Sequence, residues 1–240
     1  MNATSEGVRV YAEHDPEMPE EFSELLIRML THHLENSTNP HYTELLNKLW
    51  VAGMNCLPDE KLKVTYAKLM QQEVEHGAIT ARILEGLGVG PVTSPIKQYL
   101  FHLPIETYCD LAYFNGLGDR VGCYIGETWE GVPYEPLLTV AERLHKDEVF
   151  HATFGMSNLK RLCATEEGLE EANEKIKTWW PAALDMFGRS DSEFSDVYVK
   201  WNLRKKNNEE LRQQYIADTR PMLERIGIDV PDDNANRRFL

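Results

Sequence analysis

The sequence has few of the features that mark secreted, membrane-spanning or nucleic-acid-binding proteins. Its four cysteines include no CxxC pair and no framework spacing, so we expect reduced thiols rather than disulfides. No apolar run reaches the roughly 18 residues that predict a membrane span. The N-terminal stretch has neither the basic start nor the apolar core of a secretory signal. These absences favour a cytoplasmic protein with no membrane partner.

Positive charge is also scarce, because 25 basic residues face 39 acidic ones and the net charge is −14. This balance argues against nucleic acid or an anionic membrane as the main partner. An anionic substrate would therefore need a local basic patch. The conspicuous basic cluster is KWNLRKKNN at 200–208, although such a run is more often a solvated helix end.

What the sequence does contain is helical periodicity along almost its whole length. Apolar residues recur three and four apart, and no β-hairpin signal interrupts them. We expect an N-terminal extension over 1–19, one all-α domain over 20–230 and a mobile tail over 231–240. The expected helices cover 20–35, 41–56, 59–87, 95–102, 105–129, 136–163, 167–188, 192–203 and 208–226.

Two of these expected helices carry the same short motif. QQEVEHG at 71–77 places Glu73 three residues before His76, and KDEVFHA at 146–152 does the same with Glu148 and His151. Positions i and i+3 share one face of a helix, so each pair can reach a single point. Carboxylate oxygen and imidazole nitrogen together suit iron or manganese. One such motif is weak, and its histidine could be an ordinary core residue, but the repetition predicts two halves of one site.

A four-helix dimetal bundle also needs one carboxylate from each of the other two helices. Glu44 lies 29 residues before Glu73, and Asp119 lies 29 residues before Glu148, as two related helical hairpins would give. Glu35 remains an alternative for the first of these ligands, and Glu127 for the second.

The acidic neighbours of the motif glutamates have less direct roles. Glu75 cannot share the face of His76, so we expect it beside the site or in solvent. Asp147 is expected to accept a hydrogen bond from a ligand histidine and hold its tautomer, or to be exposed.

The same motifs, with Asp119 between them, resemble the phenylacetyl-CoA ring 1,2-epoxidase family, and within it the catalytic (A-type) subunit. The resemblance extends to WWPAALDMFG at 179–188 and to NNEELRQQYIADTRPMLERIGIDVPD at 207–232. It covers most of residues 20–232. It implies a ferritin-like four-helix bundle with extra C-terminal helices.

The resemblance implies an O2-dependent diiron monooxygenase that inserts one oxygen atom into an aromatic or unsaturated substrate. Two iron ions, with manganese as an alternative, would be held by six residues: Glu44, Glu73, His76, Asp119, Glu148 and His151. Four carboxylates and two imidazoles would leave two ferrous ions nearly neutral. The sequence has no flavin or iron–sulfur motif, so electrons would come from a separate reductase.

The implied substrate is an aryl-CoA thioester, as in phenylacetate catabolism. Lys200, Arg204 and Lys205 are then candidates to contact a CoA phosphate or an acidic partner. The resemblance further implies a homo-oligomer or an assembly with a paralogous ferritin-like subunit. Three other functions stay open: a stand-alone diiron oxygenase or oxidase of biosynthesis, a non-catalytic scaffold subunit, and an iron-storage or peroxide-scavenging protein.

Overall fold

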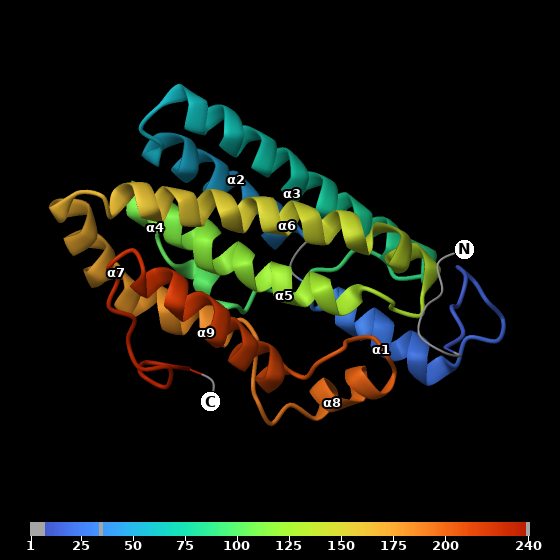
Figure 1. Cartoon of the computed structure of the whole chain (residues 1–240). Helices are drawn as coiled ribbons and strands as arrows, with labels where there is room; N and C mark the ends of the chain where they lie inside the picture. The colour runs from blue at the N-terminus through green and yellow to red at the C-terminus, as the bar shows by residue number, and fades with distance from the viewer. Residues whose placement is uncertain (1–7, 34–35, 239–240) are drawn as a thin grey trace.

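The computed structural model describes residues 8–33 and 36–238, and this part of the chain forms a ferritin-like helical bundle with additional C-terminal helices (Figure 1). The predicted all-α class is confirmed, and an isolated bridge between Tyr11 and Tyr134 is the one β-type pairing among the described residues. The helices are α1 (Glu20–Thr31), α2 (Pro40–Cys56), α3 (Glu60–Gly86), α4 (Tyr108–Tyr113), α5 (Arg120–Trp129), α6 (Glu135–Leu162), α7 (Glu166–Asp185), α8 (Glu193–Lys200) and α9 (Asn208–Glu224), with a 3₁₀ turn at Tyr99–His102 and a π-helical segment at Phe114–Asp119.

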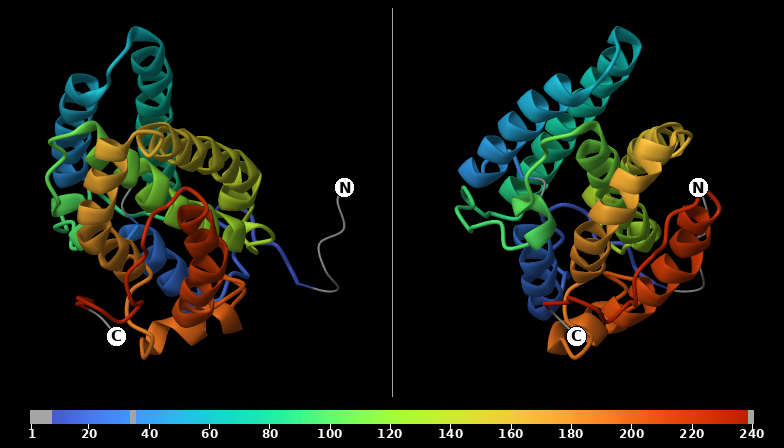
Figure 2. Two further views of the ribbon diagram at one scale, coloured as in Figure 1. Left: turned by 60° about the vertical axis from the view of Figure 1, so that its left-hand side comes forward. Right: turned by 90° about the vertical axis from the view of Figure 1, so that its left-hand side faces the viewer.

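The bundle consists of α3, α6, the continuous α4–π–α5 unit, and a first helix that is divided into α1 and α2. The α2 helix packs against α3, while α1 and the later part of α3 share an apolar cluster. Figure 2 shows the α2–α3 hairpin extending beyond the rest of the bundle. In the connection between α1 and α2, the backbone N–H of Ser37 donates to the carbonyl of Gly77 at 3.0 Å.

Local signals in the sequence explain where these helices begin and end. Asn39 caps α2 in front of Pro40, whose missing N–H costs nothing at a first helical position. Asp59 caps α3 as predicted, because its side chain accepts from the N–H of Leu62 at 2.9 Å. Gly88 follows the end of α3 with φ of 77°, a conformation that glycine adopts without strain.

Apolar residues on both sides of the two motifs build the core. On α3, Leu69 and Met70 belong to one buried cluster, whereas Ile79 and Ile83 belong to another. On α6, Leu144 and Phe154 are divided between the same two clusters. The two Glu-x-x-His motifs therefore lie at matching levels, between two apolar layers that position them.

Glycines allow the α4–π–α5 unit to lie unusually close to α6. A Cβ atom at Gly155 would overlap the backbone of Asn115 and Gly116, and one at Gly122 would overlap the carboxylate of Glu148. The π-helical segment lies at this contact, and such segments are rare and often found at functional sites. Close backbone approach thus brings the end of the π segment next to the motif of α6.

The C-terminal helices support the π segment from its other side. Tyr215 on α9 donates its hydroxyl to the carbonyl of Leu117 at 3.1 Å, and Tyr113 donates to the carbonyl of Ala172 on α7 at 2.9 Å. Both tyrosines are fully buried. The extra helices therefore form hydrogen bonds with groups next to the site and belong to the same packed unit rather than to a separate domain.

The tail, expected to be mobile over 231–240, is anchored as far as the structure describes it. Trp180 donates its indole N–H to Asp233 at 3.0 Å, and the guanidinium of Arg237 pairs with Asp185 where both side chains are inaccessible to solvent. A sequence pattern could not reveal this, because an isolated polar tail gives no sign of the buried partners that it meets.

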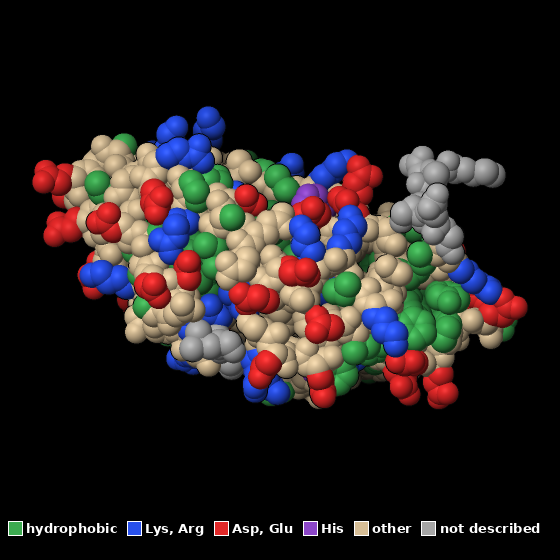
Figure 3. Space-filling model, turned by 60° about the horizontal axis from the view of Figure 1, so that its bottom comes forward, with side chains coloured by type: hydrophobic (Ala, Val, Ile, Leu, Met, Phe, Trp, Pro, Cys, Tyr) green, Lys and Arg blue, Asp and Glu red, His purple; other side chains and the backbone are tan. Residues whose placement is uncertain are grey.

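The surface carries charges of both signs in mixture. On the face in Figure 3, Lys and Arg side chains lie among Asp and Glu side chains rather than forming one basic surface. Within the described ranges, no helix combines the length and apolar character that crossing a membrane requires.

We predict that Gly155→Ala lowers the free energy of unfolding by about 2 kcal/mol, because the new methyl meets backbone atoms that cannot move aside. Urea denaturation measures this. Gly90→Ala is the matched control, since a Cβ there meets nothing within 4 Å. Equal stability of the two variants would show that the close approach of α6 to the π segment is not required.

Candidate metal centre

Five of the six predicted ligands converge in the middle of the bundle. Glu73 and His76 come from α3, Asp119 from the end of the π segment, and Glu148 and His151 from α6. The two histidines and Glu148 are buried, while Glu73 and Asp119 are partly buried. The arrangement joins the two motifs into one cluster, as their repetition predicted.

The cluster consists of two sets of three ligand atoms that share Glu73. Glu73, Asp119 and His151 form one set, and Glu73, His76 and Glu148 form the other, with the atoms of each set within 4.8 Å of one another. The Nδ1 atom of His151 lies 3.1 Å from Glu73 and 3.7 Å from Glu148, and Nδ1 of His76 lies 3.4 Å from Glu148. Each set offers the spacing that one metal ion requires.

The donor chemistry of the cluster fits iron or manganese. Its atoms are carboxylate oxygens and imidazole nitrogens, and no thiolate takes part in either set. Three carboxylates in a buried place are costly unless cations offset their charge. The residues present therefore suit a pair of divalent metal ions.

The outer nitrogens of the two histidines are joined by a short polar chain. Nε2 of His76 donates to Asp147 at 3.2 Å, and Nε2 of His151 donates to the side-chain oxygen of Gln72 at 3.2 Å. The amide of Gln72 in turn donates to Asp147. Each motif thus orients the histidine of the other, and both Nδ1 atoms are left to face the carboxylates.

Asp119 is held by its own segment. Asn115, one π turn earlier, donates to the Asp119 carboxylate at 2.8 Å. Cys123 lies one turn later, and its thiol contacts the Asp119 carbonyl at 3.8 Å. The π segment therefore both delivers Asp119 to the cluster and restricts its orientation.

Burial and crowding shift the proton affinities of the cluster. Burial raises the pKa of Asp119 well above its usual range, and the charges of Glu73 and Glu148 raise it further. For His151, burial alone would lower the pKa. The hydrogen bond and charge of Glu73, with the charges of Glu148 and Asp119, outweigh it and raise the pKa to about 9. Without metal, the cluster therefore keeps protons at neutral pH.

The structure does not bring Glu44 to the cluster. Its side chain is 63% exposed, pairs with Lys48 at 2.9 Å and lines a separate cavity of about 460 Å³. The α2 residues that line the cavity beside the candidate site are instead Tyr42, Leu45, Leu46 and Leu49. Equal counts of 29 residues do not give equal positions in the two hairpins, because the connection between α2 and α3 (57–59) has three residues, whereas the connection between α5 and α6 (130–134) has five.

The other candidates near the motifs are placed as follows. Glu35, the alternative first ligand, lies outside the described residues. Glu127 belongs to neither set of ligand atoms, which favours Asp119 over it. Glu75 is on the surface and pairs with Arg143. Asp147 orients a histidine, but it is His76 of the other motif rather than His151.

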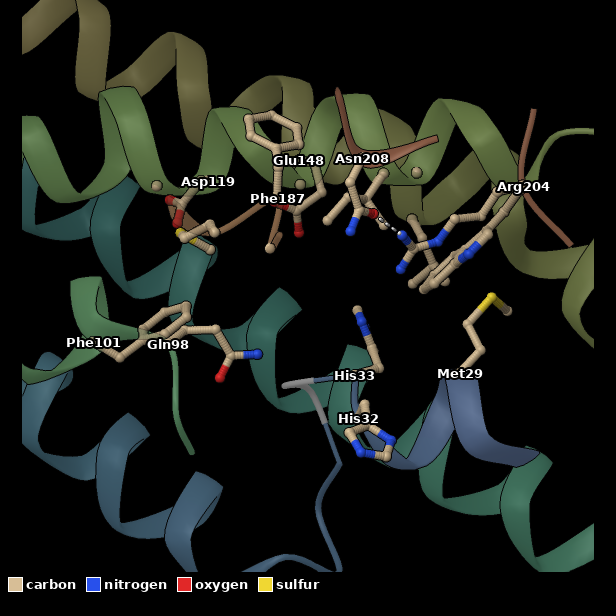
Figure 4. A pocket seen from close by; sticks show the side chains of 18 of the residues that line it. Met29, His32, His33, Gln98, Phe101, Asp119, Glu148, Phe187, Arg204 and Asn208 are labelled. Atoms are coloured by element: carbon tan, nitrogen blue, oxygen red, sulfur yellow. Dashed lines mark hydrogen bonds between the residues drawn. The ribbon is translucent and has the colours of Figure 1, made fainter. Parts of the chain in front are cut away.

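A cavity of about 720 Å³ reaches the carboxylates of the cluster (Figure 4). Glu73, Asp119 and Glu148 line one part of it, and most of its other walls are apolar. This volume falls in the range of about 300–1,000 Å³ that is usual for small-molecule sites. Its apolar walls come from many parts of the chain, among them Leu45 and Leu49, Phe101, Phe114, and Phe187.

The predicted basic cluster does not form one patch. Arg204 lines the cavity, whereas Lys205 is on the surface and pairs with Glu130 at 3.1 Å. Lys200 is exposed at the end of α8.

Comparison with known proteins shows the family of this chain. The family model described as "Phenylacetic acid catabolic protein" matches residues 96–238, which is more than half of the chain. The chain belongs to the phenylacetic acid catabolic protein family. It is also 25% identical over 233 residues to the A subunit of 1,2-phenylacetyl-CoA epoxidase from Escherichia coli (strain K12), an alignment that covers 90% of this chain and 71% of that protein.

In this member of the phenylacetic acid catabolic protein family, sequence analysis missed Gln72. Its role had a visible signal, because Gln72 and Asp147 each directly precede the glutamate of a motif. Asn115 and Gly122 were missed as well. Their roles depend on the π segment and on the approach of α6, which no local pattern announces.

We predict that Gln72→Leu weakens metal binding about 10- to 100-fold, because His151 loses the acceptor that fixes its tautomer and Asp147 loses a donor. Titration of the metal-free protein with Mn²⁺ measures this. Gln71→Leu is the control, since Gln71 is exposed and bonds only Glu75. Equal losses in both variants would contradict an orienting role for Gln72.

We also predict that Mn²⁺ affinity rises between about pH 6 and pH 8, by up to roughly tenfold per pH unit for each proton displaced. The ligands must bind without their protons; His151, with its pKa raised to about 9, carries a proton at neutral pH, and the pKa of Asp119 is raised in the same direction. Titrations at several pH values test the slope, and His151→Gln should reduce it. A flat profile in the unaltered protein would contradict the prediction.

Proposed function

We propose that this protein is an O2-dependent diiron monooxygenase that inserts one oxygen atom into an aromatic or unsaturated substrate, of the kind carried by aryl-CoA thioesters. The observation that carries the proposal is the joining of two metal-sized ligand sets to an apolar cavity of substrate size. Its family, and the name of its relative as an epoxidase subunit, support the same chemistry.

In this proposal, Glu73, His76, Asp119, Glu148 and His151 hold two iron ions, with manganese as the alternative. The bound metals would supply the activation of dioxygen, which amino-acid side chains cannot provide. The Gln72–Asp147 chain keeps both histidines oriented through their Nε2 protons. Glu73 lies in both ligand sets, so it would be a ligand in each of them.

The walls of the cavity have a separate task. Leu45, Leu49 and Phe114 present apolar side chains to the space beside the carboxylates. They would exclude water and hold a flat, apolar group against the metal pair, so that the oxygen atom reaches carbon rather than solvent. Gly118 and Gly122 also line this part and add no bulk, which leaves room for a ring next to Asp119.

Partners follow from the chemistry. Each turnover of a monooxygenase consumes two electrons from outside, so we propose a separate reductase. We also propose assembly with a paralogous ferritin-like subunit, since the relative is named as one subunit of an epoxidase. The exposed side chains of Trp50, Val51 and Val64 on the projecting α2–α3 hairpin are suited to such a contact.

The cavity favours this function over two of its alternatives. Iron storage needs ligands and an ion path, but not an apolar chamber with aromatic walls beside the ligands. A scaffold subunit needs neither the ligands nor the chamber. A stand-alone diiron oxygenase that acts on a free or carrier-bound acid would use the same features.

We predict that protein produced with sufficient iron holds close to two iron ions per chain, as two ligand sets imply. His76→Ala and His151→Ala should each lose most of this iron, because each removes one imidazole donor. Elemental mass spectrometry measures the content. His102→Ala, a histidine bonded to the carbonyl of Ile96, is the control.

If the unaltered protein held no metal under reducing, iron-replete conditions, the oxygenase proposal would fail. If the iron remained in both histidine variants, the cluster would not be its site.

A further inference from the structure

One charged side chain of the cavity is not explained by the metal centre. Arg204 lies in the segment between α8 and α9 and lines the cavity. In Figure 4, Arg204 and Asp119 lie at opposite ends of the row of labelled side chains, with Glu148 between them. A ligand that fills the cavity would therefore meet the carboxylates at one end and a guanidinium at the other.

The guanidinium of Arg204 lacks a negative partner. Among the residues that the structure describes, no carboxylate lies within ion-pair distance of it, and its Nε is buried without a hydrogen bond. Asp191 and Glu193 also line the cavity; Asp191 is bound by both arms of Arg189, and Glu193 makes no ion pair with Arg204. Burial lowers the pKa of Arg204, but an arginine keeps its charge throughout the physiological range. An uncompensated cation faces the cavity as a result.

Two neighbours orient this cation rather than neutralise it. The buried Asn208 accepts from Nη1 of Arg204 at 3.1 Å, and the Asn208 amide is itself fixed by donating to the Arg189 carbonyl at 3.0 Å. The ring of Tyr198 lies 5.3 Å from the guanidinium carbon. The dashed line in Figure 4 marks the contact between Arg204 and Asn208. Among the described residues Nη2 makes no hydrogen bond and is not inaccessible, so this nitrogen is left to donate to a ligand.

An oriented, desolvated guanidinium is the group that binds planar or tetrahedral oxyanions best, because it can donate two parallel hydrogen bonds. A buried charge without a partner costs stability, so its presence in a cavity points to a ligand that completes it. Arg28 adds a second positive charge at this end. The guanidinium of Arg28 lies over the ring of Phe194. Burial raises the pKa of the nearby Tyr198 hydroxyl, and the positive charges of Arg204 and Arg28 both oppose this rise.

We propose that Arg204, oriented by Asn208 and Tyr198, forms an oxyanion subsite that holds a carboxylate or phosphate group of the substrate while its apolar part extends towards Glu148 and Asp119. The inference rests on the proposed oxygenase function and narrows its substrate class to anionic molecules with a separate apolar end. A free aromatic acid would present a carboxylate to this subsite, and a CoA thioester a phosphate.

Calorimetric titration of the iron-loaded protein tests the subsite with three probes: phenylacetate, phenylacetyl-CoA and the neutral phenylacetamide. We expect at least one anionic probe to bind more tightly than the amide. Arg204→Gln should weaken that binding about 10- to 100-fold, as expected for a lost charge-assisted pair, and leave the amide unchanged. Arg204→Lys should restore part of the affinity. Lys205→Gln, at the neighbouring surface position, should change nothing.

The pattern across probes identifies the anion. If Arg204→Gln weakens the binding of phenylacetate alone, the subsite holds a carboxylate. If it weakens the binding of phenylacetyl-CoA alone, the subsite holds a phosphate. Either result supports the proposal. The proposal is overturned if no anionic probe binds better than the amide, or if Arg204→Gln leaves every affinity within about twofold.

Two further readouts distinguish ligand binding at Arg204 from a role in folding. Arg204→Gln should keep or raise the unfolding temperature, because it removes a buried charge without a partner. A lower unfolding temperature together with weaker amide binding would mean a purely structural role and would overturn the subsite. Iron content should be unchanged in the variant. If iron-loaded protein shows no Arg204-dependent binding, the subsite alone is refuted, whereas absence of iron in the unaltered protein refutes the oxygenase.

Discussion

The structure depends on the burial of three carboxylates and two imidazoles at the centre of a helical bundle. Such a cluster is stable only where other groups orient it and balance its charge. Gln72 and Asp147 orient the histidines, and Asn115 orients Asp119. The raised pKa values of His151 and Asp119 show the remaining imbalance, which the protein meets with protons when it lacks metal. A divalent metal pair would meet the same imbalance with its own charge.

Close helix packing makes this cluster compact. The glycine contact between α6 and the π segment brings two backbones together, and the absence of a side chain at Gly122 leaves space for the Glu148 carboxylate. The π segment turns Asp119 into the cluster at the point where α4 continues into α5. The C-terminal helices then stabilise this unusual backbone through Tyr215. The extra C-terminal helices therefore take part in shaping the site.

The cavity connects two electrostatically opposite regions. The carboxylate cluster lies in one, and Arg204 lies in the other, and most of the remaining lining of the cavity is apolar. A molecule with an anionic group and a separate apolar end fits this polarity, since each part meets its complement. The same arrangement would fix the direction in which a substrate enters. In the proposed oxygenase, orientation of this kind decides which carbon is presented to the metal centre.

The sequence by itself determined the helices and five members of the cluster, because helical periodicity and the i, i+3 spacing of Glu-x-x-His are local properties. It also indicated Asp119 over Glu127, through the equal spacing within two related hairpins. The same equal spacing did not bring Glu44 to the cluster, since the connection between α2 and α3 is shorter than the one between α5 and α6 and equal residue counts then give different positions along the helices. Only the tertiary structure decided that Asp147 serves His76, that Gln72 serves His151, and that Arg204 faces the cavity while Lys205 faces solvent. These relations join segments far apart in the chain, and their geometry is set by how the helices pack.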